Sequence, residues 1–137
     1  MRVLLDARKL GHGGIGVYID NLVHGLAAHG DVDLTLIVRE AFDPEEYSWG
    51  KGVALISDRA RPYSIDEMLG LARRIDFAGI DVFHSPHFTL PFGIRVPSVV
   101  TVHDLIHVHN PQRAFYPVVA RGLVRSSLKR ASAVVTV

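Results

Sequence analysis

Glycines crowd one short segment of the chain in a pattern that suits binding of a phosphate or a sugar hydroxyl. The segment Arg8-Lys9-Leu10-Gly11-His12-Gly13-Gly14-Ile15-Gly16 follows an apolar run and leads into a helical pattern. Glycines permit tight turns and a close approach of the backbone to a ligand. The start of the following helix offers unpaired N–H groups and the positive end of the helix dipole. We therefore predict that Arg8, Gly13, Gly14 and Gly16 bind substrate.

Two further segments carry imidazoles beside groups that fix their position. In His84-Ser85-Pro86-His87, the proline stiffens the turn and prevents further strand pairing. In Thr101-Val102-His103-Asp104, an imidazole stands beside a carboxylate at the end of an apolar run. A neutral imidazole donates to or accepts from a sugar hydroxyl, and a carboxylate binds hydroxyls or orients a histidine. We predict that His84, His87 and Asp104 bind substrate and that His103 has a functional role beside them.

Alternating strand and helix patterns predict the scaffold that positions these segments. The strands read as continuous apolar runs, which indicates that helices cover both faces of the sheet. Strand–helix alternation predicts an α/β fold with a doubly wound parallel sheet and right-handed crossovers. Ligands bind such sheets outside the carboxyl ends of the strands, so the three segments should meet at one edge. The predicted strands cover 3–5, 33–38, 53–56, 81–84, 97–102 and 133–137, and the helices cover 15–29, 64–76 and 114–131.

Apolar spacing also predicts which helix faces are buried. In the helix over 64–76, the expected core face consists of Ile65, Met68, Leu69, Ala72 and Ile75, which recur at spacings of three and four. Tyr47, Trp49 and Tyr63 lie in the least regular stretch, where we expect them to pack under a loop rather than to form a platform for a sugar ring.

Composition narrows the class of protein. The 137 residues fit one domain, and a net charge of +1 favours neither nucleic acid nor an acidic partner. There is no cysteine, so disulfides and thiolate chemistry are excluded. No apolar run is long enough for a signal peptide or a membrane span, and we expect a cytoplasmic location. Because the sequence stops on a strand pattern, Ala133-Val134-Val135-Thr136-Val137, we also expect it to be part of a longer protein.

The motifs taken together resemble glycosyltransferase family 4, and most closely its mannosyltransferase-like members. The resemblance rests on Leu5-Asp6-Ala7-Arg8, Gly13-Gly14-Ile15-Gly16 with Tyr18 and Leu22, Asp81-Val82-Phe83-His84, and Thr101-Val102-His103-Asp104-Leu105. It extends to the strand pattern at 133–137. One departure is Val17, at a position where many relatives carry arginine.

The resemblance implies a retaining enzyme of the GT-B fold, with two Rossmann-like domains and a cleft between them. Residues 1–137 would be the N-terminal, acceptor-side domain, and the C-terminal domain that holds the nucleotide-sugar would be absent. The chain alone would then be inactive. The full enzyme would transfer a hexose, with mannose as the first expectation, from a GDP- or UDP-sugar to a glycan or lipid-linked acceptor. In that enzyme His103 would be the catalytic residue beside the transferred sugar, which it would bind and polarise without acting as the nucleophile. Neither a metal nor another cofactor is expected.

Three other interpretations fit parts of the sequence. Gly11-His12-Gly13-Gly14-Ile15-Gly16 satisfies the G-x-G-x-x-G pattern of an NAD(P)-binding domain, and Glu40 stands where a ribose-binding acid would be. However, Ala7 to Leu10 separate this turn from the strand, and the histidines gain no role. A zinc site at His103 and His107 is disfavoured because Pro111 makes a helix there improbable. A basic stripe of Arg121, Arg125 and Lys129, with Arg130 beside it, would suit peripheral contact with an anionic membrane, although a solvated helix face is the simpler explanation and the one we favour.

Overall fold

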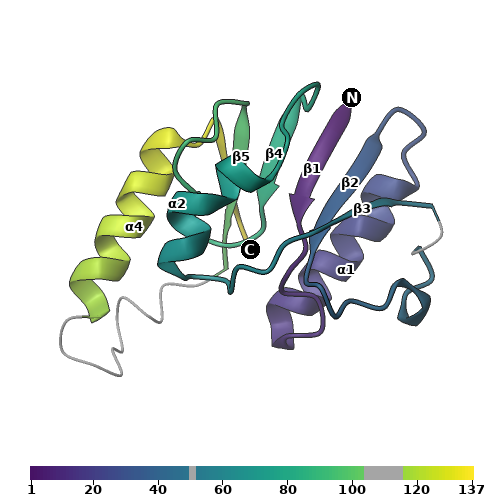
Figure 1. Cartoon of the computed structure of the whole chain (residues 1–137), viewed down its shortest axis with the longest axis horizontal. Coiled ribbons are helices and arrows are strands. Elements are labelled where there is room, and N and C mark those ends of the chain that lie inside the picture. The colour runs from purple at the N-terminus through teal and green to yellow at the C-terminus, as the bar shows by residue number, and fades with distance from the viewer. Residues whose placement is uncertain (50–51, 104–115) are drawn as a thin grey trace.

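A parallel sheet of six strands forms the centre of the molecule (Figure 1). The computed structural model describes residues 1–49, 52–103 and 116–137. The strands are β1 (Arg2–Asp6), β2 (Asp33–Val38), β3 (Ala54–Ser57), β4 (Val82–Ser85), β5 (Ser98–Val102) and β6 (Ala133–Thr136). Between them lie α1 (Gly13–Ala27), the 3₁₀ turn η1 (Pro44–Glu46), α2 (Ile65–Arg74) and α4 (Tyr116–Arg130).

The strand order creates a switch point at the middle of the sheet. The order is β3-β2-β1-β4-β5-β6, so the chain moves outward in one direction from β1 and in the other from β4. β1 pairs in parallel with both β2 and β4, with Leu5 opposite Leu36 on one side and His84 on the other. In doubly wound sheets the ligand crevice opens where the order reverses, outside the carboxyl ends of the strands. In this fold the order reverses between β1 and β4, so their carboxyl ends mark the switch point.

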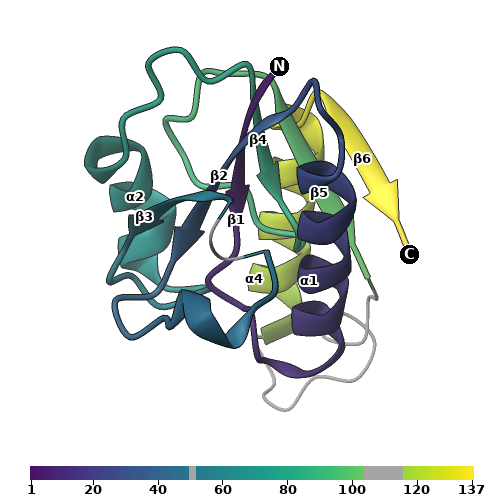
Figure 2. The same ribbon diagram turned by 90° about the vertical axis from the view of Figure 1, so that its right-hand side faces the viewer.

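Helices cover both faces of the sheet, and the sheet separates two apolar cores (Figures 1 and 2). On one face, Ile19 and Val23 of α1 pack with Val3 and Leu5 of β1. On the other, Leu71 of α2 packs with residues that alternate with these along the strands, such as Leu4 and Phe83. Strand side chains alternate between faces, so each apolar run supplies both cores at once. The predicted class, a Rossmann-like α/β fold with helices on both faces, is confirmed.

A loop rather than a helix connects β4 to β5, and α4 secures it. The Ser127 hydroxyl of α4 accepts from the Leu90 amide at 2.9 Å. The Arg130 guanidinium donates to the Leu90 and Pro91 carbonyls and lies over the Phe92 ring, 4.4 Å from its centroid. These bonds satisfy backbone groups that would otherwise be buried without partners. Arg130 is therefore a structural residue, whereas Arg121, Arg125 and Lys129 are exposed as the predicted basic stripe requires.

The predicted core face of α2 is partly wrong. Met68 and Ile75 are buried as expected, but Ile65 is 79% exposed and Leu69 55% exposed. The buried face instead includes Glu67, whose carboxylate accepts from Arg8. Because an ion pair with a buried arginine orients this face inward, part of the apolar stripe is turned toward solvent.

Tyr47 and Trp49 do pack under a loop: with Phe42 they form a ring cluster against the first core, and the Trp49 indole donates to Asp20 at 2.6 Å. Among the described residues, none of the helices combines the length and hydropathy needed to cross a membrane.

Candidate functional site

The glycine segment forms a tight, open turn at the carboxyl end of β1. Gly11 and Gly13 have positive φ values of 76° and 56°, which other residues rarely adopt. Gly16 is buried, and a Cβ there would lie 2.9 Å from the Gly11 amide nitrogen and 3.1 Å from the Lys9 carbonyl oxygen. By contrast, Gly13 and Gly14 are exposed, with nothing within 4 Å of an added Cβ.

The first turn of α1 is suited to receive a negatively charged or hydroxyl-bearing ligand. Its N-cap residue, His12, makes no side-chain capping hydrogen bond, and the turn contains no acidic residue. The first N–H groups of a helix lack partners within the helix and carry the positive end of its dipole. Gly13 and Gly14 thus offer accessible amides, while Gly16 lets the turn pack closely on itself.

His103 links its own segment to the turn after β4 and to α1, the helix that follows the glycine segment. Its ring meets the Tyr18 ring of α1 edge to face, with centroids 4.7 Å apart. Its Nε2 donates to the Pro86 carbonyl at 2.9 Å, which ties the end of β5 to the turn after β4. Since a carbonyl only accepts, Nε2 carries the hydrogen, and Nδ1 is the acceptor atom of the neutral ring. A half-buried imidazole with this tautomer can accept a hydrogen bond from a sugar hydroxyl.

His84 is connected to Tyr18, the ring partner of His103, by a short chain of hydrogen bonds. Its Nε2 is 2.9 Å from the Thr101 hydroxyl, which in turn is 3.2 Å from the Tyr18 hydroxyl. His84 is only 8% exposed. Burial, with the nearby His87, lowers the pKa of His84 to about 4, so the ring is neutral near pH 7. His84 therefore supports the Tyr18–His103 pair from below instead of facing a ligand directly.

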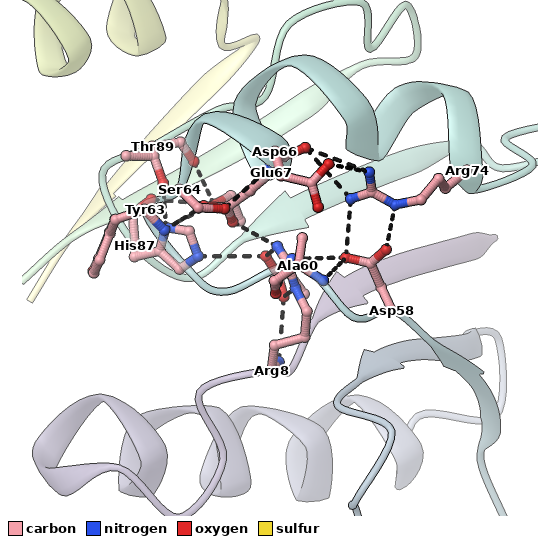
Figure 3. Close-up of polar contacts among 12 residues, drawn as sticks. Arg8, Asp58, Ala60, Tyr63, Ser64, Asp66, Glu67, Arg74, His87 and Thr89 are labelled. Atoms are coloured by element: carbon pink, nitrogen blue, oxygen red, sulfur yellow. Dashed lines mark hydrogen bonds and ion pairs between the residues drawn. The ribbon is translucent and has the colours of Figure 1, made fainter.

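A buried ionic network centred on Arg8 fixes the neighbouring loops (Figure 3). The guanidinium donates to Asp6 at 2.7 Å, to Asp58 at 3.0 Å and to Glu67 at 2.5 Å. Burial by itself lowers the pKa of Arg8, but its hydrogen bond to Asp6 and the three carboxylates raise that pKa above its ordinary value. Burial raises the pKa of Glu67. At Asp6 the hydrogen bonds from Arg8, together with the nearby His87 ring, outweigh burial and hold the pKa far below its usual range. Arg8 therefore remains charged and has no accessible surface for a substrate.

His87 belongs to the same network. Its Nδ1 is 2.7 Å from the Thr89 hydroxyl, and its Nε2 faces Asp6 at 3.4 Å. Asp6, Glu67 and His87 together have the donor types of a metal site. However, both oxygens of Asp6 and one of Glu67 already accept from Arg8, and the other Glu67 oxygen accepts from the Tyr63 amide. A metal cation would have to displace a guanidinium, so the donor set fits the arginine rather than a metal.

The sequence predictions for the site thus separate into two groups. Gly13, Gly14 and His103 lie at the ligand edge with accessible atoms. Arg8, His84 and His87 are at the same edge but below the surface, where their burial leaves them to support the site rather than to touch a substrate. Gly16 is buried in the turn, and Asp104 lies outside the described residues, as do His107 and Pro111.

Sequence reasoning missed a cavity of about 510 Å³ beside the glycine turn. It opens at the ends of β1, β2 and β3 and is lined by Lys9, His12, Arg39, Glu40, Asp58, Arg59, Ala60, Arg61, Pro62 and Tyr63. Tyr63, expected to pack under a loop, forms part of its wall. The signal that could have revealed it is the pair Arg59 and Arg61, which begins three residues after the predicted strand 53–56.

The model of the family described as Glycosyltransferase Family 4 matches residues 12–137, nearly the whole chain. The chain belongs to glycosyltransferase family 4. No curated protein and no solved structure matches it. The matched region contains Gly13, Gly14, Tyr18 and His103 and begins after Arg8 and Lys9.

Proposed function

We propose that this family 4 domain is the acceptor-side half of a retaining glycosyltransferase. The complete enzyme would transfer a hexose, with mannose as our first choice, from a nucleotide-sugar to a glycan or lipid-linked acceptor. A second Rossmann-like domain would hold the nucleotide diphosphate across the cleft. Residues 1–137 alone would then lack the groups that stabilise the leaving diphosphate and would be inactive.

The contact of His103 with Tyr18 and Pro86 carries this proposal. It brings the helix that follows the glycine turn and the ends of β4 and β5 to one place beside the switch point of the sheet. A sugar lying there would meet the exposed amides of Gly13 and Gly14 on one side and an imidazole on the other. In the transfer step the bond from the anomeric carbon to the diphosphate breaks, and the acceptor oxygen forms the new bond as its proton passes to the departing diphosphate oxygen. His103 would bind a hydroxyl of the transferred sugar through Nδ1 and would not act as the nucleophile.

No resident metal is part of this mechanism. Helix dipoles and cationic side chains would neutralise the diphosphate, as in the GT-B enzymes that the sequence resembles. Sugar transfer by the complete enzyme should therefore persist in excess EDTA.

The direct test is a transfer assay with the complete polypeptide that contains this domain. GDP- and UDP-linked hexoses would be offered with candidate acceptors, and the anomeric configuration of the product would be read by NMR. Product with retained configuration, together with no turnover by residues 1–137 alone, supports the proposal. Inverted configuration contradicts it, as does turnover by the isolated domain.

A second candidate, NAD(P) binding, is favoured by one observation. Glu40 follows β2 and lines the cavity that also includes His12 of the glycine turn, where a ribose-binding acid would stand. Against it, Ala7 to Leu10 form a separate turn between β1 and the first glycine, with the Leu10 amide donating to the Ala7 carbonyl at 3.0 Å. Titration with NADPH, followed by its fluorescence, separates the two candidates: micromolar binding favours the dinucleotide.

A further inference from the structure

The cavity beside the glycine turn concentrates positive charge. Lys9 follows β1, Arg39 follows β2, and Arg59 and Arg61 follow β3, so three successive strand ends deliver cations to one opening. Arg39, Arg59 and Arg61 are exposed, and in the part of the chain that the structure describes none of the three takes part in an ion pair.

The carboxylates of the cavity do not balance these cations. Asp58 is buried and already accepts from two arginines, Arg8 at 3.0 Å and Arg74 at 2.7 Å. Glu40 is the remaining acidic residue among those that line the cavity. Four cationic side chains thus surround an opening with one carboxylate not committed to an ion pair. Such an arrangement attracts anions and holds them by charge-assisted hydrogen bonds.

Buried contacts fix the loop that presents the two arginines after β3. Asp58 and Ala60 are buried, whereas Arg59 and Arg61 between and after them are exposed. Arg8 donates to the Ala60 carbonyl at 3.1 Å, and the Ala60 amide donates to Asp58 at 3.2 Å. Because Asp58 and Ala60 are held in the interior, the residues that alternate with them, Arg59 and Arg61, are exposed to solvent. A loop held in this way is preorganised and loses little conformational entropy when a ligand binds.

Tyr63 forms the wall at the end of this loop in an unusual backbone conformation. Its φ is 66°, the one positive value among the described residues other than glycine. Glu67 accepts from its amide at 2.5 Å, and its ring stacks on Phe88 with centroids 5.2 Å apart. The Lys9 ammonium lies 3.7 Å from the centre of the Tyr63 ring. A bulky residue in the left-handed region persists only where its surroundings enforce it, and such residues cluster at ligand sites.

We infer that this cavity is a subsite for a phosphate group on the acceptor, and this inference rests on the proposed transferase function. Arginine forks match phosphate oxygens two at a time, and several cations around one cavity suit a group with two negative charges better than a single carboxylate. The subsite adjoins His12 of the glycine turn, so a phosphorylated acceptor bound there would direct the rest of the molecule along the ligand edge. Both a soluble phosphorylated acceptor and a lipid-linked phosphate have this chemistry.

Titration of residues 1–137 with inorganic phosphate at constant ionic strength tests the subsite, with amide shifts read by NMR. Wild type should show saturable shifts around residues 58–63. The double variant Arg59→Gln/Arg61→Gln should bind at least tenfold more weakly. The matched control, Arg95→Gln/Arg125→Gln, removes two exposed arginines from elsewhere and should bind as wild type does. Equal weakening in both variants would mean non-specific attraction and overturn the inference, as would the absence of saturable shifts in wild type.

Two further arms identify the source of the phosphate and separate this inference from the proposed function. Co-sedimentation with vesicles containing phosphatidic acid, lost in Arg59→Gln/Arg61→Gln, points to a lipid-linked phosphate; phosphate binding without co-sedimentation points to a soluble one. Arginine-dependent phosphate binding by a protein without transferase activity would retain the subsite and reject the transferase. Conversely, if the complete enzyme transfers sugar and the double variant leaves the KM for the acceptor unchanged, the subsite is rejected and the transferase stands.

Discussion

The Arg8 guanidinium lies 2.5 Å from the Glu67 carboxylate, and both side chains are fully buried. This contact links the segment that follows β1 to the first turn of α2. The loop between β3 and α2 leads into that turn. The contact explains why α2 buries a charged residue and leaves apolar ones in solvent. It also connects a residue that we expected to bind substrate with the loop that presents the exposed arginines of the cavity.

Replacing Arg8 should strongly destabilise the fold. Arg8→Met leaves Asp6, Asp58 and Glu67 buried without their shared cation, and breaking a buried ionic group in this way costs about 3–5 kcal/mol. The free energy of unfolding, measured by urea denaturation with circular dichroism, gives the effect. Arg125→Met removes an exposed arginine and should stay within about 0.5 kcal/mol of wild type. A loss below about 1 kcal/mol for Arg8→Met would show that the network is not a structural centre.

The glycine turn should tolerate an added methyl group at one position and not at another. In Gly16→Ala the new Cβ meets backbone atoms of Gly11 and Lys9 at 2.9 and 3.1 Å, so the turn must shift. We expect a loss of about 1–3 kcal/mol, the usual cost of overpacking. Gly14→Ala meets nothing within 4 Å and should be neutral or slightly stabilising. Thermal unfolding compares the two variants directly, and equal melting temperatures would refute the close-packed turn.

Acidification should weaken the fold in two separable ranges. The pKa of His84 falls from 6.5 to about 4 on folding, so the unfolded chain binds the proton first and stability declines as the pH drops between these values. The full effect of this one group is about 3 kcal/mol. Asp6 also has a lowered pKa, but its contribution is lost only below its ordinary value of 3.8.

The variant His84→Gln separates these contributions. Its amide can still bond to Thr101 but does not titrate, so the decline in unfolding free energy between pH 6.5 and 4 should become shallower than in wild type. His29→Gln, at an exposed position, serves as the control and should keep the wild-type slope. An unchanged slope in His84→Gln would assign the pH dependence to other groups.

The fold could be predicted from the sequence because its signals are local and consistent. Apolar runs marked every strand, and β2 begins and ends at the predicted residues, Asp33 and Val38. The observed order of β1, β4 and β5 is the one that the general rule for doubly wound sheets gives. The orientation of α2 could not be predicted, because it depends on an ion pair between residues 59 positions apart. The spacing of apolar residues within a helix contains no information about such a pair.

The sequence predicts where the candidate residues lie in the fold, but not which of their side chains are buried. Sequence position placed the glycine turn, Pro86 and His103 at one edge, and the contacts of His103 agree with that placement. Whether a polar side chain at a strand end faces solvent or the interior depends on its partners. Arg8 and His87 both have Asp6 as a partner, a carboxylate that the sequence shows only within the motif Leu5-Asp6-Ala7-Arg8.

The most direct test of the account is the turnover of the complete transferase with His103→Ala. Loss of one active-site contact should lower kcat about a hundredfold, while the enzyme still folds, with a melting temperature lowered only by the loss of the Pro86 hydrogen bond and the Tyr18 ring contact. His29→Ala, at an exposed position away from the ligand edge, should turn over as wild type does. A folded His103→Ala enzyme with undiminished kcat would remove the imidazole from the reaction and contradict the assignment of this edge to the transferred sugar.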